Sequence, residues 1–162
     1  MKKILLLIVS CLAISLYSCK TPTVIDGSNA YTTFETECLG VELDGTQTLR
    51  AWGTGKNKGD AIDQAKKNAV RDVIFKGITS GSSECNKRPL IFEVNAQEKY
   101  EYYFNAFFAD GGEYKKYVDL GDEKRTSRIK ASNNTQEAWS VVVRVHRAEL
   151  KTKLIQDNII KP

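Results

Sequence analysis

The chain has 162 residues and a formal net charge of +4, from 24 basic and 20 acidic side chains. That length suits one domain with its own hydrophobic core, and a second domain is not expected. So small a basic excess gives no reason to expect a nucleic-acid partner, which a strongly basic surface would indicate.

Residues 1–18 have the two parts of a secretory signal. Lys2 and Lys3 precede an apolar run over residues 4–16, which is interrupted only by two serines. As a helix this run would reach about 20 Å, short of the roughly 30 Å hydrocarbon core of a bilayer. We therefore expect a cleaved signal peptide rather than a permanent membrane span.

The apolar run ends in Leu16-Tyr17-Ser18-Cys19, which resembles the lipobox of bacterial lipoproteins. The resemblance implies cleavage before Cys19 and acyl chains on that residue. At about 0.8 kcal/mol per buried methylene, two or three chains would hold the protein stably at a membrane. An ordinary cleaved signal followed by a chance cysteine is the alternative.

Residues 19–33 form a polar segment with Pro22 and Gly27 and without apolar periodicity. This composition predicts a flexible tether between the lipid and the folded domain. Lys20, rather than an acidic residue, follows the lipid site, which resembles the sorting pattern of lipoproteins bound for an outer membrane. We expect a lipid-anchored envelope protein there, facing the periplasm, although the sequence alone leaves the face of the membrane open.

The remaining cysteines support export. Cys11 lies in the signal peptide and Cys19 carries the lipid, so Cys38 and Cys85 remain as a single pair. Outside the cytoplasm such a pair can form a lasting disulfide. Closing a loop of about 48 residues would stabilise the fold by roughly 4 kcal/mol. Two buried free thiols are the alternative.

The folded domain is expected over residues 34–162 and opens with a hairpin. Residues 34–43 and 46–54 are predicted strands, and they flank Asp44-Gly45, a dipeptide that favours a tight turn.

The strongest helix signal lies in residues 57–76. Asn57 is a predicted N-cap, Asp60 completes an approximate capping box, and Gly77 is expected to end the helix. The apolar residues recur at spacings of three and four, on one face; they are Ile62, Ala65, Ala69, Val70, Val73 and Ile74.

The rest of the chain predicts further short elements. Residues 79–88 are a predicted loop that carries Cys85, residues 89–94 a short strand, and residues 97–109 a second helix rich in aromatic side chains. Residues 138–146 have the two-residue period of a strand: one face carries Trp139, Val141, Val143 and Val145, and the other carries Ser140, Val142, Arg144 and His146.

The basic residues 124–131 are the expected partner of that strand, at an edge of the sheet. Residues 150–159 predict a short amphipathic helix. Together the elements predict an α+β fold: an antiparallel sheet with a long alanine-rich helix and an aromatic-rich second helix packed on it.

The glycine-rich turn before the long helix is a candidate ligand site. Gly53, Gly55, Lys56 and Lys58 could contact an anion or a glycan through backbone amides and lysine side chains. The spacing matches neither the P-loop nor the GxGxxG dinucleotide motif. A strand-to-helix turn with a purely structural role is therefore the favoured interpretation.

No pattern of residues predicts catalysis. His146 is the only histidine, which excludes a zinc site with several histidines, and no GxSxG nucleophile motif is present. We expect no enzymatic activity, no metal site and no cofactor. The aromatic residues 100–108 are expected to pack mainly in the core, whereas Tyr102, Tyr114 and Tyr117 are candidates for surface contact.

One stretch resembles a known group of envelope proteins. It comprises Leu-Arg-Ala-Trp-Gly-Thr-Gly at residues 49–55, Asp60-Ala61, Ala65, Ala69 and Ile-Phe-Lys-Gly-Ile at residues 74–78. The pattern is similar to the N-terminal domain of flagellar assembly protein T and its lipoprotein relatives. The resemblance implies a strand that runs into an alanine-rich helix packed on an antiparallel sheet, and a non-enzymatic role in an envelope assembly.

The sequence thus predicts a membrane-tethered, non-catalytic lipoprotein that binds another component of the cell envelope, either a protein assembly or the cell-wall polymer. The alternative is a small-ligand protein or enzyme that binds an anion or a glycan through the loop Gly53–Gly59.

Overall fold

The computed structural model describes residues 24–26, 34–121, 128–132 and 137–162. The predicted signal peptide of residues 1–18, the predicted lipid site Cys19 and the predicted tether, apart from residues 24–26, lie outside the described residues. None of the described helices is both long and apolar enough to cross a membrane.

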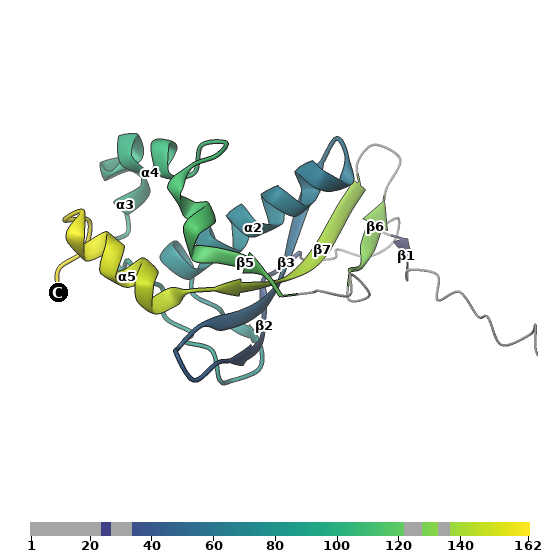
Figure 1. The fold of residues 1–162 in the computed structure, drawn as a ribbon, viewed down its shortest axis with the longest axis horizontal. Coiled ribbons are helices and arrows are strands. Elements are labelled where there is room, and N and C mark those ends of the chain that lie inside the picture. The colour runs from purple at the N-terminus through teal and green to yellow at the C-terminus, as the bar shows by residue number, and fades with distance from the viewer. Residues whose placement is uncertain (1–23, 27–33, 122–127, 133–136) are drawn as a thin grey trace, which may run out of the picture.

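The chain folds into a mixed β-sheet, with the long helix on one face and the shorter helices gathered at one end (Figure 1). The strand order is β1 (Val24–Asp26), β6 (Lys130–Ser132), β7 (Glu137–Val145), β3 (Gln47–Gly55), β2 (Glu37–Val41) and β4 (Ser80–Gly81). A further strand, β5 (Val118–Leu120), pairs with the C-terminal part of β7, on the same side as β6, which pairs with the N-terminal part. The α+β class is confirmed. The sheet is mixed rather than wholly antiparallel, because β1 with β6 and β2 with β4 are parallel pairs.

The β2–β3 hairpin forms as predicted. Gly45 has a φ of +83°, in the left-handed region that favours glycine. The Asp44 carboxylate accepts a hydrogen bond from the Thr46 N–H at 2.9 Å, which supports the turn. The pairing register shifts between Cys38 and Gly40.

Helix α2 (Lys58–Phe75) confirms the strongest helix prediction. Its N-cap Asn57 accepts a hydrogen bond from the Asp60 N–H at 3.0 Å and donates one to the Asp60 carboxylate at 2.9 Å. The first of these bonds satisfies a backbone donor that the helix itself leaves unpaired. The helix packs on β3 and β7 through Ala61, Ala65, Ala69, Val70, Val73 and Ile74.

The strand predicted at residues 89–94 is wrong. The N–H groups of Leu90 and Ile91 donate to the carbonyls of Val73 and Ile74, at 3.1 and 2.9 Å. Those carbonyls belong to the last turn of α2 and need partners outside the helix. The segment therefore binds the helix end instead of another strand. Within the predicted loop of residues 79–88, only β4 is regular.

The predicted second helix is divided into α3 (Ala96–Lys99) and α4 (Glu101–Phe107), so the prediction of one continuous helix is wrong. Tyr100 lies between them with a φ of −111° and a ψ of 27°. Aromatic residues have only modest helix propensity, and buried residues anchor both sides of the break, Ala96 on one and Phe104 on the other. Tertiary packing therefore decides where the helix is interrupted.

A 3₁₀-helix, η1 (Glu113–Tyr117), and β5 follow, and neither was predicted. Strand β7 confirms the predicted strand of residues 138–146. Its partner β6 covers the end of the predicted partner strand, of which residues 124–127 lie outside the described residues. The expected edge position of that strand is wrong, because β1 pairs with the outer side of β6. Helix α5 (Arg147–Gln156) confirms the helix expected near the C-terminus.

Candidate functional site

Close packing explains the glycine-rich turn. A Cβ atom on Gly53 would lie 2.2 Å from the Ala61 carbonyl oxygen, and one on Gly55 would lie 2.5 Å from the Ala61 nitrogen. Both positions therefore need glycine for α2 to rest on β3. Lys58 Nζ lies 4.4 Å from the centre of the Trp139 ring, a cation–π contact, and Lys56 is exposed. Anion or glycan contact at this turn stays a prediction.

Cys38 and Cys85 form the predicted disulfide. Their sulfur atoms lie 2.08 Å apart and their Cα atoms 5.9 Å apart. Both residues are buried in the main core. The bond joins β2 to the loop after β4. This loop leads to Leu90 and Ile91, which bind the end of α2.

The aromatic residues divide between core and surface. Phe104, Phe107 and Phe108 are buried, as expected. Tyr114 is only 1% exposed, so its predicted surface role is wrong. Helix η1 turns it inward, where the centre of its ring lies 6.0 Å from the centre of the Phe108 ring. Tyr102 is 93% exposed, as a surface contact requires, whereas Tyr117 is partly buried against the core.

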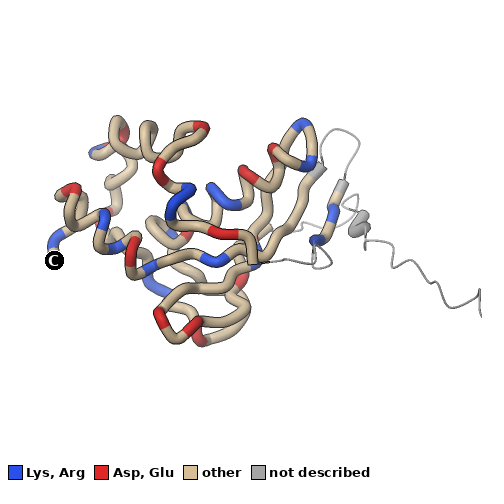
Figure 2. The backbone as a smooth tube through the Cα atoms, in the orientation of Figure 1, with Lys and Arg blue, Asp and Glu red and all other residues tan. Residues whose placement is uncertain are grey.

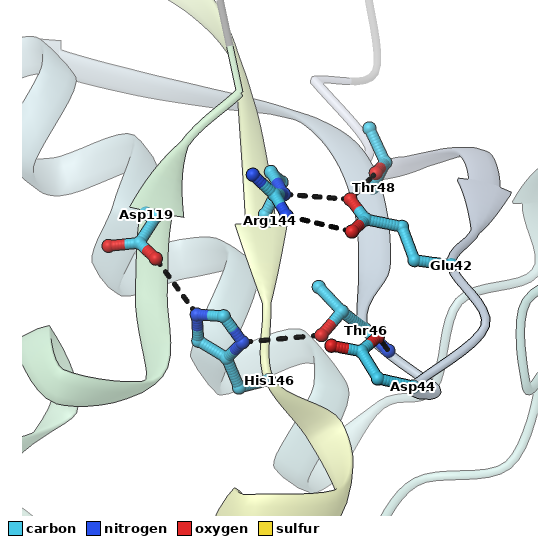
Figure 3. A network of polar contacts seen from close by, with 7 residues as sticks. All are labelled: Glu42, Asp44, Thr46, Thr48, Asp119, Arg144 and His146. Carbon is cyan, nitrogen blue, oxygen red and sulfur yellow. Dashed lines mark hydrogen bonds and ion pairs between the residues drawn. The ribbon is translucent and has the colours of Figure 1, made fainter.

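A network of polar contacts surrounds His146 at the C-terminal end of β7 (Figure 3). Its Nε2 lies 2.9 Å from Asp119 Oδ2 on β5, and its Nδ1 lies 3.2 Å from Thr46 Oγ1 at the hairpin. Beside it, Arg144 donates from Nε and Nη2 to the two carboxylate oxygens of Glu42, both at 2.7 Å. The sequence showed no sign of this network, because only the folded sheet brings these strands together.

The carboxylate, imidazole and hydroxyl of this network are ordered as in a hydrolase triad, but the hydroxyl is not accessible. Thr46 is 3% exposed, so a substrate could not reach its oxygen. The neighbouring Asp44 carboxyl has a lowered pKa, chiefly because it accepts the hydrogen bond from the Thr46 backbone. The geometry therefore gives His146 a linking role between the hairpin, β5 and β7.

A groove of about 800 Å³ lies between the segment of residues 90–93 and helix α5 with the residues that follow it. We call it the terminal groove. Its apolar lining consists of Leu90, Ile91, Phe92, Tyr100, Ile155, Ile159, Ile160 and Pro162. A second hollow, of about 520 Å³, shares Ile91 and Phe92 with it and extends to Val94. Phe92 is 71% exposed and Val94 97% exposed, so two large apolar side chains face solvent at its border.

Both walls of the terminal groove are anchored to the domain. On one side, Leu90 and Ile91 are bound to the end of α2. On the other, the Arg147 guanidinium at the start of α5 donates to the Arg88 carbonyl at 2.9 Å. Burial lowers the pKa of Arg147, which is consistent with a position between the two walls. The groove is therefore formed before any partner binds.

Helix α5 is also held at its C-terminal end. Lys153 Nζ lies 3.2 Å from Glu113 Oε2 and 3.1 Å from Asp157 Oδ2, and the Tyr103 hydroxyl donates to Asp157 at 2.6 Å. Burial and the bond to Asp157 raise the pKa of Tyr103. Burial alone would raise the pKa of Asp157, but the bonds from Tyr103 and Lys153 lower it below its ordinary value of 3.8.

This contact makes a prediction about stability and pH. Tyr103→Phe should lower the free energy of unfolding by about 1–2 kcal/mol at pH 7, because a hydrogen bond to a charged group is lost. Since the folded-state pKa of Asp157 is lowered, its contribution is present above pH 3.8 and is lost as the pH falls through the folded-state value. Urea unfolding at pH 7 and pH 2 should show a smaller difference at pH 2. Tyr102→Phe, on the exposed tyrosine, is the control and should change nothing; an equal loss in both variants would contradict the assignment.

Comparison of the chain with protein-family models, with curated proteins and with solved structures found no match. In the described part of the chain, no group of three or more His, Cys, Asp or Glu side chains could hold a metal ion.

The sequence predicted the apolar residues of α5 but not the terminal groove. The other wall of the groove lies some sixty positions earlier in the chain, in the segment that was wrongly predicted to be a strand.

Proposed function

We propose that this chain is a membrane-tethered, non-catalytic lipoprotein that binds another component of the cell envelope. The terminal groove carries the proposal: it is preformed and apolar, and its lining residue Phe92 is exposed to solvent, as is Val94 in the adjoining hollow. A monomeric domain gains nothing from leaving such side chains in water, and contiguous apolar surfaces of this kind are used for recognition.

The tether supports an orientation for this recognition. Val24 in β1 comes five residues after Cys19, so a lipid on Cys19 would lie within about 18 Å of the strand. Strand β1 and helix α5 lie at opposite ends of the molecule (Figure 1). A lipid anchor at Cys19 therefore leaves the terminal groove facing away from the membrane, toward the periplasm if the anchor is in an outer membrane.

A protein partner fits this groove better than the cell-wall polymer. Sugars are bound through many hydrogen bonds to their hydroxyl groups, whereas the lining is dominated by isoleucine, leucine and aromatic side chains. The likeness of residues 49–78 to lipoprotein relatives of flagellar assembly protein T favours the same class of role. Both considerations favour an envelope protein assembly as the partner.

Lipidation is tested by metabolic labelling of the full chain with radioactive palmitate. We expect label on the wild-type protein and none on Cys19→Ser, because that sulfur is the proposed acceptor. Label that persists on Cys19→Ser, or a precursor that keeps residues 1–18 and stays out of the membrane fraction, would remove the tether from the proposal.

Recognition is tested by photo-crosslinking in intact cells. A photoreactive amino acid in place of Phe92 should yield a specific crosslinked product, because Phe92 borders the groove. The same amino acid in place of Tyr102 is the control, since Tyr102 is also an exposed aromatic residue but does not line the groove. Equal products from both positions, or none from position 92, would argue against the groove as the recognition surface.

A further inference from the structure

We infer that the terminal groove binds an acidic, apolar peptide segment of the partner protein. The inference rests on the proposed function and specifies the chemistry of its partner. Apolar side chains of the segment would lie on the isoleucines of the floor, and its carboxylates would meet lysines at the rim.

The charges around the groove are unbalanced. Three lysines line it, Lys99, Lys151 and Lys161, against a single acidic residue, Glu93. Lys99 already neutralises that residue, because its Nζ lies 2.8 and 3.1 Å from the two Glu93 oxygens. In the described part of the chain, neither Lys151 nor Lys161 has an ion-pair partner.

Helix α5 continues this basic surface. Lys and Arg positions recur along it (Figure 2). Arg147 lies one turn before Lys151, but it is partly buried and donates to the Arg88 carbonyl, so Lys151 and Lys161 are the cations that face a ligand. Complementary charge at the rim of an interface selects partners and accelerates their encounter. The ligand that suits an apolar floor with an unpaired cationic rim is therefore an apolar segment flanked by Asp or Glu.

Two other occupants fit less well. A second copy of this chain, docked through the same surface, would bring together two patches with the same excess of positive charge, since a two-fold interface pairs a patch with itself. With the proposed anchor on Cys19, the bilayer would lie near β1, and β1 is at the opposite end of the molecule from α5 (Figure 1). A segment of another protein meets neither obstacle.

The test selects peptides with the full lipidated protein in nanodiscs of neutral phosphatidylcholine. A display library of random twelve-residue peptides is the probe, with empty nanodiscs used to remove lipid binders. We expect selected peptides to be enriched in Asp and Glu together with apolar residues. Their affinity, measured by fluorescence anisotropy, should fall about tenfold or more with Lys151→Glu/Lys161→Glu, because attraction at the rim becomes repulsion.

The control is Lys56→Glu/Lys58→Glu, an identical charge change at the turn before α2, which should leave the affinity unchanged. Peptides without an acidic excess, or equal binding to the Lys151→Glu/Lys161→Glu protein, would overturn the inference but leave the proposed function standing. Binding that survives Phe92→Ser would place the peptide outside the groove and also overturn it. Self-association that depends on Lys151 and Lys161 would assign the groove to a second copy. Loss of palmitate label or of crosslinking from position 92, by contrast, concerns the proposed function itself.

Discussion

Removing the Cys38–Cys85 disulfide is expected to lower the free energy of unfolding by about 4 kcal/mol. The two cysteines are 47 positions apart, so the bond removes much of the chain's freedom in the unfolded state while leaving the folded state little changed. A domain of this size has a total stability of about 5–15 kcal/mol. The loss would therefore leave the reduced protein marginal.

The measurement is urea unfolding of the oxidised and the reduced protein, followed by circular dichroism. The double variant Cys38→Ala/Cys85→Ala should unfold like the reduced wild type and should not respond to reductant. A difference below about 1 kcal/mol between oxidised and reduced protein would contradict the chain-entropy account. Because β2 and the loop after β4 lie at one edge of the sheet, reduction should loosen that edge first, as hydrogen exchange can show.

Gly53→Ala is expected to destabilise the domain by roughly 3 kcal/mol or more, at the upper end of the cost of overpacking a core. The new Cβ would lie 2.2 Å from the Ala61 carbonyl oxygen and 2.3 Å from the Ala65 nitrogen. Both are backbone atoms of α2, so no side chain can rotate away to make room. The helix would have to lift from β3.

Gly111→Ala is the matched control for this variant. Gly111 has a φ of +79°, but a Cβ there would meet nothing within 4 Å. That substitution should therefore cost only the conformational penalty, about 1 kcal/mol. Thermal or urea unfolding of both variants separates the two effects. Similar losses in Gly53→Ala and Gly111→Ala would show that contact with α2 is not what requires glycine at position 53.

The same pair of variants bears on the glycine-rich turn as a ligand site. Close packing accounts for Gly53 and Gly55, so their presence no longer argues for a phosphate-binding loop. Of the two lysines in that prediction, Lys58 contacts the Trp139 ring, and Lys56 is exposed.

Local patterns determined a large part of this protein. A two-residue period identified β7, the spacing of alanines and branched residues identified α2, and Asp44-Gly45 identified the hairpin turn. The cysteine count predicted the disulfide, with two free thiols as the alternative. The strand, helix and turn predictions depend on interactions between residues close in sequence. The disulfide prediction depends on which cysteines remain once the other two are assigned elsewhere. Both kinds of argument need only the sequence.

Only the tertiary structure decided the rest. Residues 89–91 do not form a strand, because the unpaired carbonyls at the end of α2 accept their hydrogen bonds. Tyr100 interrupts the predicted second helix, because buried residues anchor the chain on both sides of it. Tyr114 is buried because η1 turns its side chain toward the core. The terminal groove and the His146 network join residues from distant parts of the chain. Side chains on separate elements meet only after the sheet has ordered its strands. No periodicity along the chain could therefore have predicted the groove or the network.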